Sequence, residues 1–215
     1  MRFQAQRLLR PRSRGFAATP ATGAVLPLGS PSLLLPCAAV PPSDILSSTS
    51  LHHEMETLRF ALTAFRLRHG FGRGIAAPQL GIQKRFVAIQ LPRHAHPYVY
   101  LNPEITWQSP ETFTMWDDCM CFPDILVRVT RHTSISLRFL DDHGVLRDED
   151  ALPQAESELF QHELDHLDGR LAVHLVDPRP LSVAQLLDEH PTRVVRRHDF
   201  EADRAKYQAL VDYVI

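Results

Sequence analysis

The chain has 215 residues, 44% of them hydrophobic, and a formal net charge of −2. This length and composition indicate one domain with a sizeable core plus a tail, and the charge gives no general case for nucleic-acid binding. Three cysteines, an odd number, argue against a disulfide framework and favour free or ligand thiols in a reducing compartment. No apolar run reaches the roughly 18 residues of a membrane span.

The N-terminal segment differs from the rest of the chain. Its first 43 residues contain five arginines and no acidic residue, so they carry +5 and the remainder carries −7. Arg-rich, acid-free sequence with Ser and Leu is typical of an organellar transit peptide, although a disordered extension without a targeting role is the alternative. Ala, Pro and Ser dominate residues 17–42, which indicates a linker. We therefore expect residues 1–46 to be a transit peptide and disordered linker, and the location to be mitochondrial or in another organelle.

The remaining pattern predicts, in chain order, a helix, several strands, a second helix and a helical tail. Apolar spacings of 3 and 4 from Leu51 to Phe65 predict an amphipathic helix that ends near Gly70, followed by a glycine-rich loop over residues 70–74. The predicted strands are residues 86–91, 98–101, 105–107, 113–116, 126–129 and 134–140, with a turn at 141–144 before one more strand. The later predicted helices are residues 156–167, 181–187 and 200–214. This order favours an α+β catalytic domain over residues 47–176 and a helical C-terminal extension over 177–215.

The most informative stretch is His162-Glu163-Leu164-Asp165-His166. Residues i and i+4 share one face of a helix, so His162 and His166 can reach a single metal ion. Glu163 lies beside them, where it can handle the proton of a water molecule that the metal activates. Apolar neighbours place part of this helix inside the protein, where two histidines would need partners. The motif therefore indicates a metal hydrolase, and a solvated helix face is the alternative.

A catalytic metal needs a third protein ligand and an open position for water. The candidates are Asp117, Asp118, Cys119 and Cys121, which lie together in residues 116–123. Thiolate binds Fe²⁺ or Zn²⁺ beside imidazoles, and both cysteines would face the same side of an extended segment. Spacing alone does not choose between them, and two buried core thiols are the alternative.

Amide hydrolysis also needs a donor for the oxyanion that develops on the carbonyl. Residues 72–79 read Gly-Arg-Gly-Ile-Ala-Ala-Pro-Gln. The small residues let a substrate backbone approach closely, and Gln79 offers a neutral amide. A glycine-rich turn before a buried strand is the alternative reading of this segment.

Together the three segments resemble the peptide deformylase family. That family shows a Gly-x-Gly-x-Ala-Ala-x-Gln loop, a Glu-Gly-Cys-Leu-Ser segment and a Gln-His-Glu-x-Asp-His helix, in this order. The first motif is complete in residues 72–79 and the third in residues 161–166, and the resemblance extends over about residues 51–176. Three motifs in the family order are a far more specific signal than one.

The resemblance implies antiparallel-rich sheets around a central metal-binding helix, an α+β peptide deformylase-like fold. It implies that Cys119, His162 and His166 hold one divalent ion, with Fe²⁺ expected and Zn²⁺ or another divalent ion as a substitute. Glu163 would be the general acid/base, while Gln79 and the backbone N–H of Met120 would hold the oxyanion. The substrates would be N-formyl-methionyl peptides or nascent chains made in an organelle, the product formate, and the ribosome a candidate partner. The oligomeric state is left open.

The second motif departs from the family pattern at four positions, where Asp117, Asp118, Met120 and Cys121 replace Glu, Gly, Leu and Ser. Asp117 keeps the negative charge and can still pair with Arg131. Asp118 adds a carboxylate beside the substrate, and Arg73 adds a cation in the first loop. We therefore predict an Arg73–Asp118 ion pair across the cleft.

Glu158 is a further departure, because it lies one helical turn before His162 on the same face. The family has an apolar residue there that helps to line its methionine pocket. An unpaired buried carboxylate is costly, so the pocket is open to water, or Glu158 finds a cation, or the substrate side chain is not a plain methionine. We expect Gly72, Gly74, Asp118 and Glu158 to line the substrate site.

Three functions follow from these observations. The first is an active organellar peptide deformylase, and the second is a related metal amidase with a different N-acyl or peptide substrate. The third is a catalytically weak, metal-stabilised protein that binds peptides. The intact Glu163 and Gln79 argue against the third function, because a silent scaffold has no use for both, while the altered cleft keeps the second open.

Overall fold

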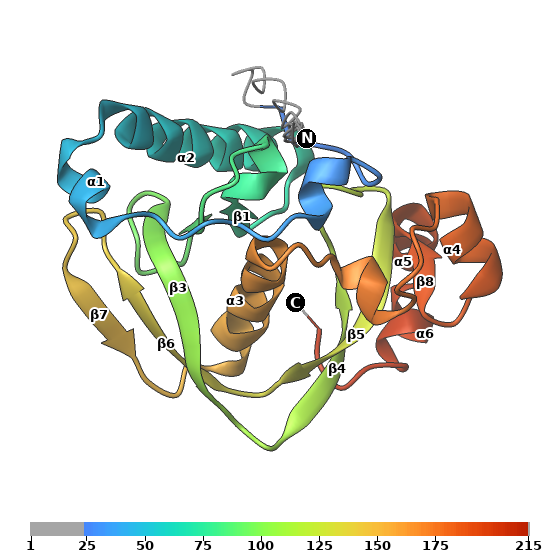
Figure 1. The fold of residues 1–215 in the computed structure, drawn as a ribbon. Coiled ribbons are helices and arrows are strands. Elements are labelled where there is room, and N and C mark those ends of the chain that lie inside the picture. Colours follow the sequence, from blue (N-terminus) through green and yellow to red (C-terminus); the bar gives the residue numbers. More distant parts are fainter. Residues whose placement is uncertain (1–23, 215) are drawn as a thin grey trace, which may run out of the picture.

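The structure, a computed structural model, describes residues 24–214 (Figure 1). The helices are α1 (Pro42–Ser47), α2 (Thr49–His69), α3 (Gln154–Leu167), α4 (Val183–Glu189), α5 (Arg197–Ala202) and α6 (Arg204–Gln208). Short 3₁₀ turns are η1 (Pro31–Leu34), η2 (Ala77–Leu80) and η3 (Ala172–Leu175). The strands are β1 (Gly74–Ala76), β2 (Phe86–Ile89), β3 (Tyr98–Gln108), β4 (Thr112–Asp117), β5 (Ile125–His132), β6 (Ile135–Leu140), β7 (Leu146–Glu149) and β8 (Val194–Arg196).

Two antiparallel sheets enclose the helix α3. The larger sheet has the order β1-β2-β3-β6-β7 and the smaller one β4-β5-β8. Helix α3 lies between them and contacts β1 and β2 on one side and β5 on the other (Figure 1). Its apolar side chains, among them Phe160 and Leu164, pack with Tyr100 and Phe139 of the larger sheet. The predicted α+β fold with a central helix is therefore confirmed.

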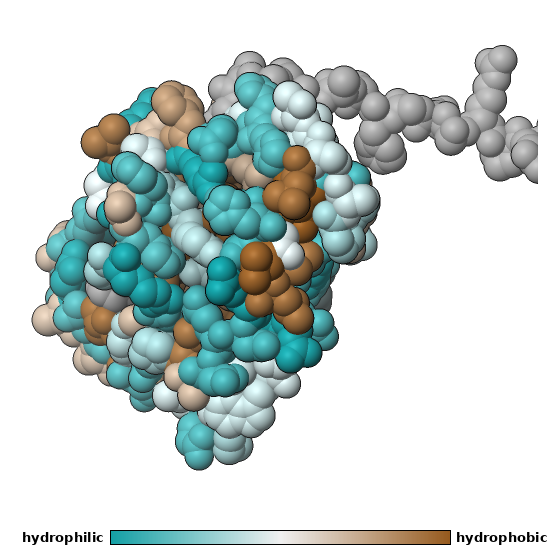
Figure 2. Space-filling model, turned by 90° about the vertical axis from the view of Figure 1, so that its left-hand side faces the viewer, coloured by the Kyte–Doolittle hydropathy of each residue, from teal (hydrophilic) through white to brown (hydrophobic). Residues whose placement is uncertain are grey.

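Helix α2 covers the larger sheet and follows the predicted pattern. The Ser48 hydroxyl accepts a hydrogen bond from the Leu51 N–H at the start, and Gly70 ends the helix with a left-handed φ of 77°. Leu58 and Leu62 are among the residues that it buries. Figure 2 shows the side of the molecule with α1, α2 and β7, where the surface is mostly hydrophilic and hydrophobic residues gather in small separate groups. No helix within residues 24–214 is both long and apolar enough to cross a membrane.

The prediction of a disordered linker up to residue 46 is wrong for residues 24–46, which pack on the domain. The N–H of Leu26 donates to the carbonyl of Gln79 and that of Leu28 to the carbonyl of Cys121, both at 2.8 Å. Leu33 and Val40 are buried in the core. This segment has little regular structure of its own, because its hydrogen bonds go to loops of the domain. The predicted transit peptide otherwise falls on residues 1–23, outside the described residues.

The C-terminal extension contains a strand that the sequence pattern did not predict. Strand β8 pairs with β5, and its Val194 and Val195 are buried. The predicted helix over residues 181–187 corresponds to α4, whereas the one over 200–214 is divided into α5 and α6 and ends at Gln208. Beyond it, the N–H of Tyr213 donates to the carbonyl of Thr114 on β4 at 3.1 Å. The extension therefore completes the smaller sheet.

Strand β3 replaces the two shorter strands that were predicted over residues 98–101 and 105–107. Asn102, between them, has a φ of 48° and sits at an irregularity in the β3–β6 pairing. Its side chain bonds both the N–H and the carbonyl of Val40, at 2.7 and 2.8 Å. These two hydrogen bonds of Asn102 thus link the larger sheet to the N-terminal segment.

Candidate active site

Helix α3 and the turn after β4 bring a thiol and an imidazole together. Cys119 lies two residues after the end of β4, and its Sγ lies 3.3 Å from Nε2 of His166. Both side chains are buried. Burial and the neighbouring Cys121 raise the pKa of the Cys119 thiol, so a stable thiolate requires a nearby cation. Burial and His162 lower the pKa of His166, which keeps this ring in the neutral form that binds metals.

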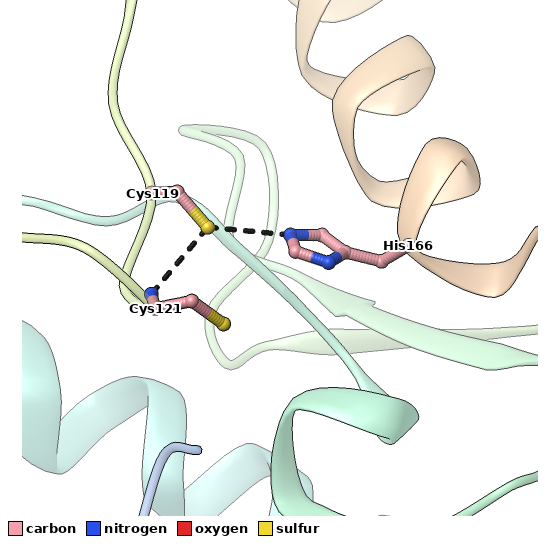
Figure 3. A group of neighbouring side chains, drawn as sticks. All are labelled: Cys119, Cys121 and His166. Atoms are coloured by element: carbon pink, nitrogen blue, oxygen red, sulfur yellow. Dashed lines mark hydrogen bonds between the residues drawn. The ribbon is translucent and has the colours of Figure 1, made fainter. Parts of the chain in front are cut away.

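A second thiol joins this pair. The donor atoms of Cys119, Cys121 and His166 all lie within 4.8 Å of one another, and Figure 3 shows both thiols on the same side of their turn. Sulfur and imidazole ligands suit Zn²⁺ or Fe²⁺. Within the described part of the chain, Oε2 of Glu163 and Nδ1 of His166 are buried without a hydrogen-bond partner. The donor set and the unpartnered carboxylate beside it therefore fit a bound divalent ion.

His162 is held by a network of charges behind it. Its Nδ1 and Oδ2 of Asp117 are 3.0 Å apart, and Arg131 bonds Asp117 at 3.0 Å and Asp165 at 2.5 Å. Burial alone would raise the pKa of Asp117, but His162 and Arg131 outweigh it and lower that pKa to about 2. The pairing of Asp117 with Arg131 is as expected. A carboxylate at Nδ1 orients a metal-binding histidine and leaves its Nε2 for the ion.

The same carboxylate raises the pKa of His162 to about 9 against the opposing effect of burial, so an ion bound at Nε2 would displace a proton. His162 is not part of the group formed by Cys119, Cys121 and His166. Its ring centroid nevertheless lies only 5.0 Å from that of His166. The role of His162 as a ligand therefore stays a prediction.

Glu163 is buried directly against the glycine-rich loop. Burial raises its pKa to about 7, a value suited to proton transfer near neutral pH. A Cβ at Gly74 would lie 2.5 Å from Oε1 of Glu163, so this close approach requires glycine. Gly72 has a φ of 100°, and a Cβ there would lie 2.7 Å from Cε of Met120. Both glycines of the first motif thus make room for side chains of the site.

Gln79 and Met120 provide N–H donors on the other side of the site. Oε1 of Gln79 accepts a hydrogen bond from the N–H of Ala76 at 2.7 Å, which leaves its Nε2 facing Cys119 and Cys121 at 3.7 and 3.5 Å. Within the described chain, the N–H of Met120 has no intramolecular hydrogen-bond acceptor. The Met120 N–H is therefore available for a developing oxyanion, and the Gln79 amide, which contacts both sulfurs, is the second candidate donor.

A cavity of about 270 Å³ opens onto these groups. Every residue predicted for the site lines it except His166, which is reached through Cys119. The predicted site residues that line the cavity are Gly72, Gly74, Gln79, Asp118, Cys119, Met120, Glu158, His162 and Glu163. The structure thus gathers the predicted site residues from three separate parts of the sequence.

The predicted Arg73–Asp118 ion pair is wrong. Arg73 bonds Glu158 and donates to the carbonyl of Ala155 at 3.0 Å, because the loop before β1 passes over the first turns of α3. Of the three alternatives for Glu158, the structure therefore shows a cation partner. Burial still outweighs this cation and raises the pKa of Glu158 to about 7. The charged pair occupies part of the cavity next to Glu163.

Asp118 instead pairs with Arg197, a residue that sequence reasoning did not place in the site. Their side chains are 3.0 Å apart, and the guanidinium of Arg197 lies 3.9 Å from the ring centroid of Phe71. These residues also line a second cavity of about 380 Å³ next to the first. The Arg197–Asp118 pair spans 79 positions, so no local pattern could have revealed it.

Comparison with known proteins agrees with this geometry. The family model described as polypeptide deformylase matches residues 23–180. The peptide deformylase of Thermotoga neapolitana is 36% identical over 110 residues, which cover 51% of this chain and 65% of that protein. A peptide deformylase-like protein of Brucella melitensis is 38% identical over 105 residues, covering 48% and 62%. The chain thus spans about two thirds of the length of these relatives.

Solved structures give the same result. The peptide deformylase of Thermotoga maritima superimposes with a TM-score of 0.62 at 28% identity, covering 71% of this chain and 95% of that one. The peptide deformylase of Synechococcus elongatus, in complex with actinonin, gives a TM-score of 0.65 at 25% identity and covers 86% and 94%. The chain therefore belongs to the polypeptide deformylase family.

Proposed function

We propose that this protein is a metal-dependent hydrolase that removes the formyl group from the N-terminal methionine of newly made organellar proteins and releases formate. The observation that carries the proposal is the position of Glu163, whose buried and partly unpartnered carboxylate lines the same cavity as Cys119, the thiol that contacts His166. Membership of the family supports it.

Cys119, His162 and His166 would hold a divalent ion, for which Fe²⁺ is expected and Zn²⁺ or another divalent ion is a substitute. When bound, the ion supplies a Lewis acid that activates water and polarises the formyl carbonyl. The Asp117–Arg131–Asp165 network behind α3 keeps His162 in the orientation that this requires.

The side chains of the site would carry the remaining steps. Glu163 takes a proton from water as the water oxygen bonds to the formyl carbon. The amide of Gln79 and the N–H of Met120 donate hydrogen bonds to the oxygen on which negative charge develops. Glu163 then returns the proton to the departing nitrogen as the C–N bond breaks, which leaves formate and a free amino terminus.

A second candidate is an amidase that acts on another N-acyl group or peptide. It is favoured by the Arg73–Glu158 pair, which places two charges in the cavity where the family pattern has an apolar residue. A methionine side chain that met these groups would gain little, because it offers them no hydrogen bond and cannot replace their hydration.

The organellar location is part of the proposal and rests on the arginine-rich, acid-free first 43 residues. It agrees with a formyl-methionine substrate, because organellar translation starts with that residue. Fusing residues 1–46 to a fluorescent protein should direct it to mitochondria or another organelle. Diffuse fluorescence from this fusion would count against the location without affecting the enzymatic proposal.

The enzymatic proposal is tested by formate release. The full-length chain, loaded anaerobically with Fe²⁺, should release formate from formyl-Met-Ala-Ser and leave acetyl-Met-Ala-Ser intact. Release of acetate rather than formate would favour the amidase. Stoichiometric binding of the ion with no hydrolysis of either peptide would favour the catalytically weak peptide-binding protein.

A further inference from the structure

The site contains one more metal-binding side chain than a catalytic ion with an open water position requires. Cys121 lies two residues after Cys119, is 3% exposed, and has its Sγ within 4.8 Å of both Sγ of Cys119 and the His166 ring. Both thiols therefore reach the same small volume (Figure 3).

The hydrogen bonds around Cys119 and Cys121 direct N–H donors at both sulfurs. The Gln79 amide is anchored through its Oε1 to the Ala76 N–H, so its Nε2 donors are directed at both sulfurs. The N–H of Cys121 also donates to Sγ of Cys119 at 3.4 Å. N–H donors stabilise anionic acceptors more strongly than neutral ones, and thiolate is the form that binds metals. Three N–H···S contacts therefore serve this pair.

The third cysteine of the chain shows the contrast. Cys37 is only partly buried, and its Sγ lies 3.8 Å from Oε1 of Gln83, a hydrogen-bond acceptor. It lies outside the group formed by Cys119, Cys121 and His166. A hydrogen-bond acceptor therefore faces the Cys37 sulfur, whereas N–H donors face the sulfurs of Cys119 and Cys121.

We propose that Cys121 is a second thiolate ligand of the ion, which is then held by two sulfurs together with His166 and His162. Two thiolates cancel the charge of a divalent ion, whereas one leaves a positive charge. Such a site prefers thiophilic ions such as Zn²⁺ over Fe²⁺. The inference rests on the proposed function only for the presence of an ion.

The test is the absorption spectrum of the full-length chain loaded anaerobically with Co²⁺, in which the thiolate-to-cobalt charge-transfer band grows with the number of thiolate ligands. Cys121→Ser restores the residue of the family pattern and should lower this band to about half, as should Cys119→Ser. Cys37→Ser is the matched control and should leave the band unchanged. A Cys121→Ser band of wild-type intensity would overturn the proposal.

A second measurement needs no variant. X-ray absorption of the Zn²⁺-loaded wild-type chain should show two sulfur neighbours at about 2.3 Å, and a single sulfur neighbour would overturn the proposal. Neither readout depends on turnover. Two sulfur neighbours without formate release would support Cys121 as a ligand and contradict the deformylase function. One sulfur neighbour with formate release would support the deformylase function and contradict Cys121 as a ligand.

Discussion

The two sides of the cleft use charge in different ways. The site floor is formed by His162, Glu163, Asp165 and His166 of α3 together with Asp117 and Arg131. The cleft wall is formed by the ion pairs Arg73–Glu158 and Asp118–Arg197. In the floor, the Arg131 guanidinium and its carboxylate partners are at most 8% exposed, whereas in the wall only Glu158 is so deeply buried.

We infer from this difference that the floor serves the chemical step and the wall selects the substrate. In the floor, α3 matches the family's helix motif at every fixed position. The charged residues of the floor hold His162 in place and leave the Glu163 carboxyl group available for proton transfer. The wall departs from the family pattern at Arg73, Asp118 and Glu158. Arg73 pairs with Glu158, and Asp118 pairs with Arg197 of the C-terminal extension. A change in the floor should therefore affect catalysis or folding, and one in the wall should affect which substrates are accepted.

The largest effect on activity is expected from the floor. Glu163→Gln removes the proton carrier and should lower kcat for formate release by about 10²–10⁴-fold. Because it also removes a buried carboxyl group whose Oε2 has no partner in the described chain, thermal stability should not fall. Steady-state assays and thermal melts of this variant, with exposed Glu104→Gln as the control, check both parts. A fall in stability that matches the fall in activity would indicate a structural role instead.

The largest effect on stability should come from Arg131. Arg131→Met breaks two buried ion pairs and leaves Asp117 with only His162 and Asp165 with only Arg170 as partners, so it should lower the free energy of unfolding by about 3–5 kcal/mol. Urea denaturation measures this. Arg138→Met is a matched control, because Arg138 pairs with Asp148 on the surface and should contribute under about 1 kcal/mol. Equal losses in the two variants would remove the distinction between buried and exposed pairs.

The pH dependence of stability should reveal Glu158. Burial raises its pKa from 4.5 to about 7, so the folded state binds its proton more tightly than the unfolded state. Its contribution to stability is present in full below pH 4.5 and is lost as the pH rises through about 7. Over this window the unfolding free energy of the wild type should fall by about 3 kcal/mol relative to Glu158→Gln. Parallel pH profiles for the two proteins would contradict this assignment.

In the wall, single and double replacements should differ in their effect on the free energy of unfolding. Arg73→Met leaves the buried Glu158 carboxyl without its partner, and Glu158→Met leaves the Arg73 guanidinium without its acceptor. Each should lower the unfolding free energy by about 1–3 kcal/mol. The double variant Arg73→Met/Glu158→Met removes both charges and should recover most of this loss. A double-mutant cycle by urea denaturation gives the coupling, and additive losses would show that the pair is not energetically linked.

The smallest effect is expected at the mouth of the cleft. Asp118 and Arg197 are 30% and 22% exposed, so water screens their attraction. Asp118→Asn should change the unfolding free energy by less than about 1 kcal/mol, again measured by urea denaturation. A loss as large as that of Arg131→Met would mean that the C-terminal extension depends on this pair.

The same division explains what the sequence could predict. The floor follows from local spacing, because residues four apart on a helix must share a face, and α2 and α3 begin and end close to their predicted limits. The partners in the wall are separated by 85 and 79 positions, so their pairing depends on how α3, the glycine-rich loop and α5 meet in space. The resemblance to the family placed Arg73 and Asp118 at the cleft but could not choose their partners.

Two parts of the fold escaped prediction for related reasons. Residues 24–46 have no hydrophobic periodicity, and their order comes from hydrogen bonds to the Gln79 and Cys121 carbonyls and from burial of single residues such as Leu33. Strand β8 has only three residues, too few to show an alternating pattern, and exists because β5 offers a free edge. In both cases tertiary contacts decide the local structure.

The most direct test of the account is formate release from formyl-Met-Ala-Ser by the wild type and by Arg73→Met/Glu158→Met, each loaded anaerobically with Fe²⁺. If the floor carries out deformylation and the wall limits access of methionine, both proteins release formate and the double variant has a kcat/KM higher by about tenfold or more. If neither protein releases formate above the level of its Glu163→Gln counterpart, the floor does not perform this chemistry and the account is contradicted.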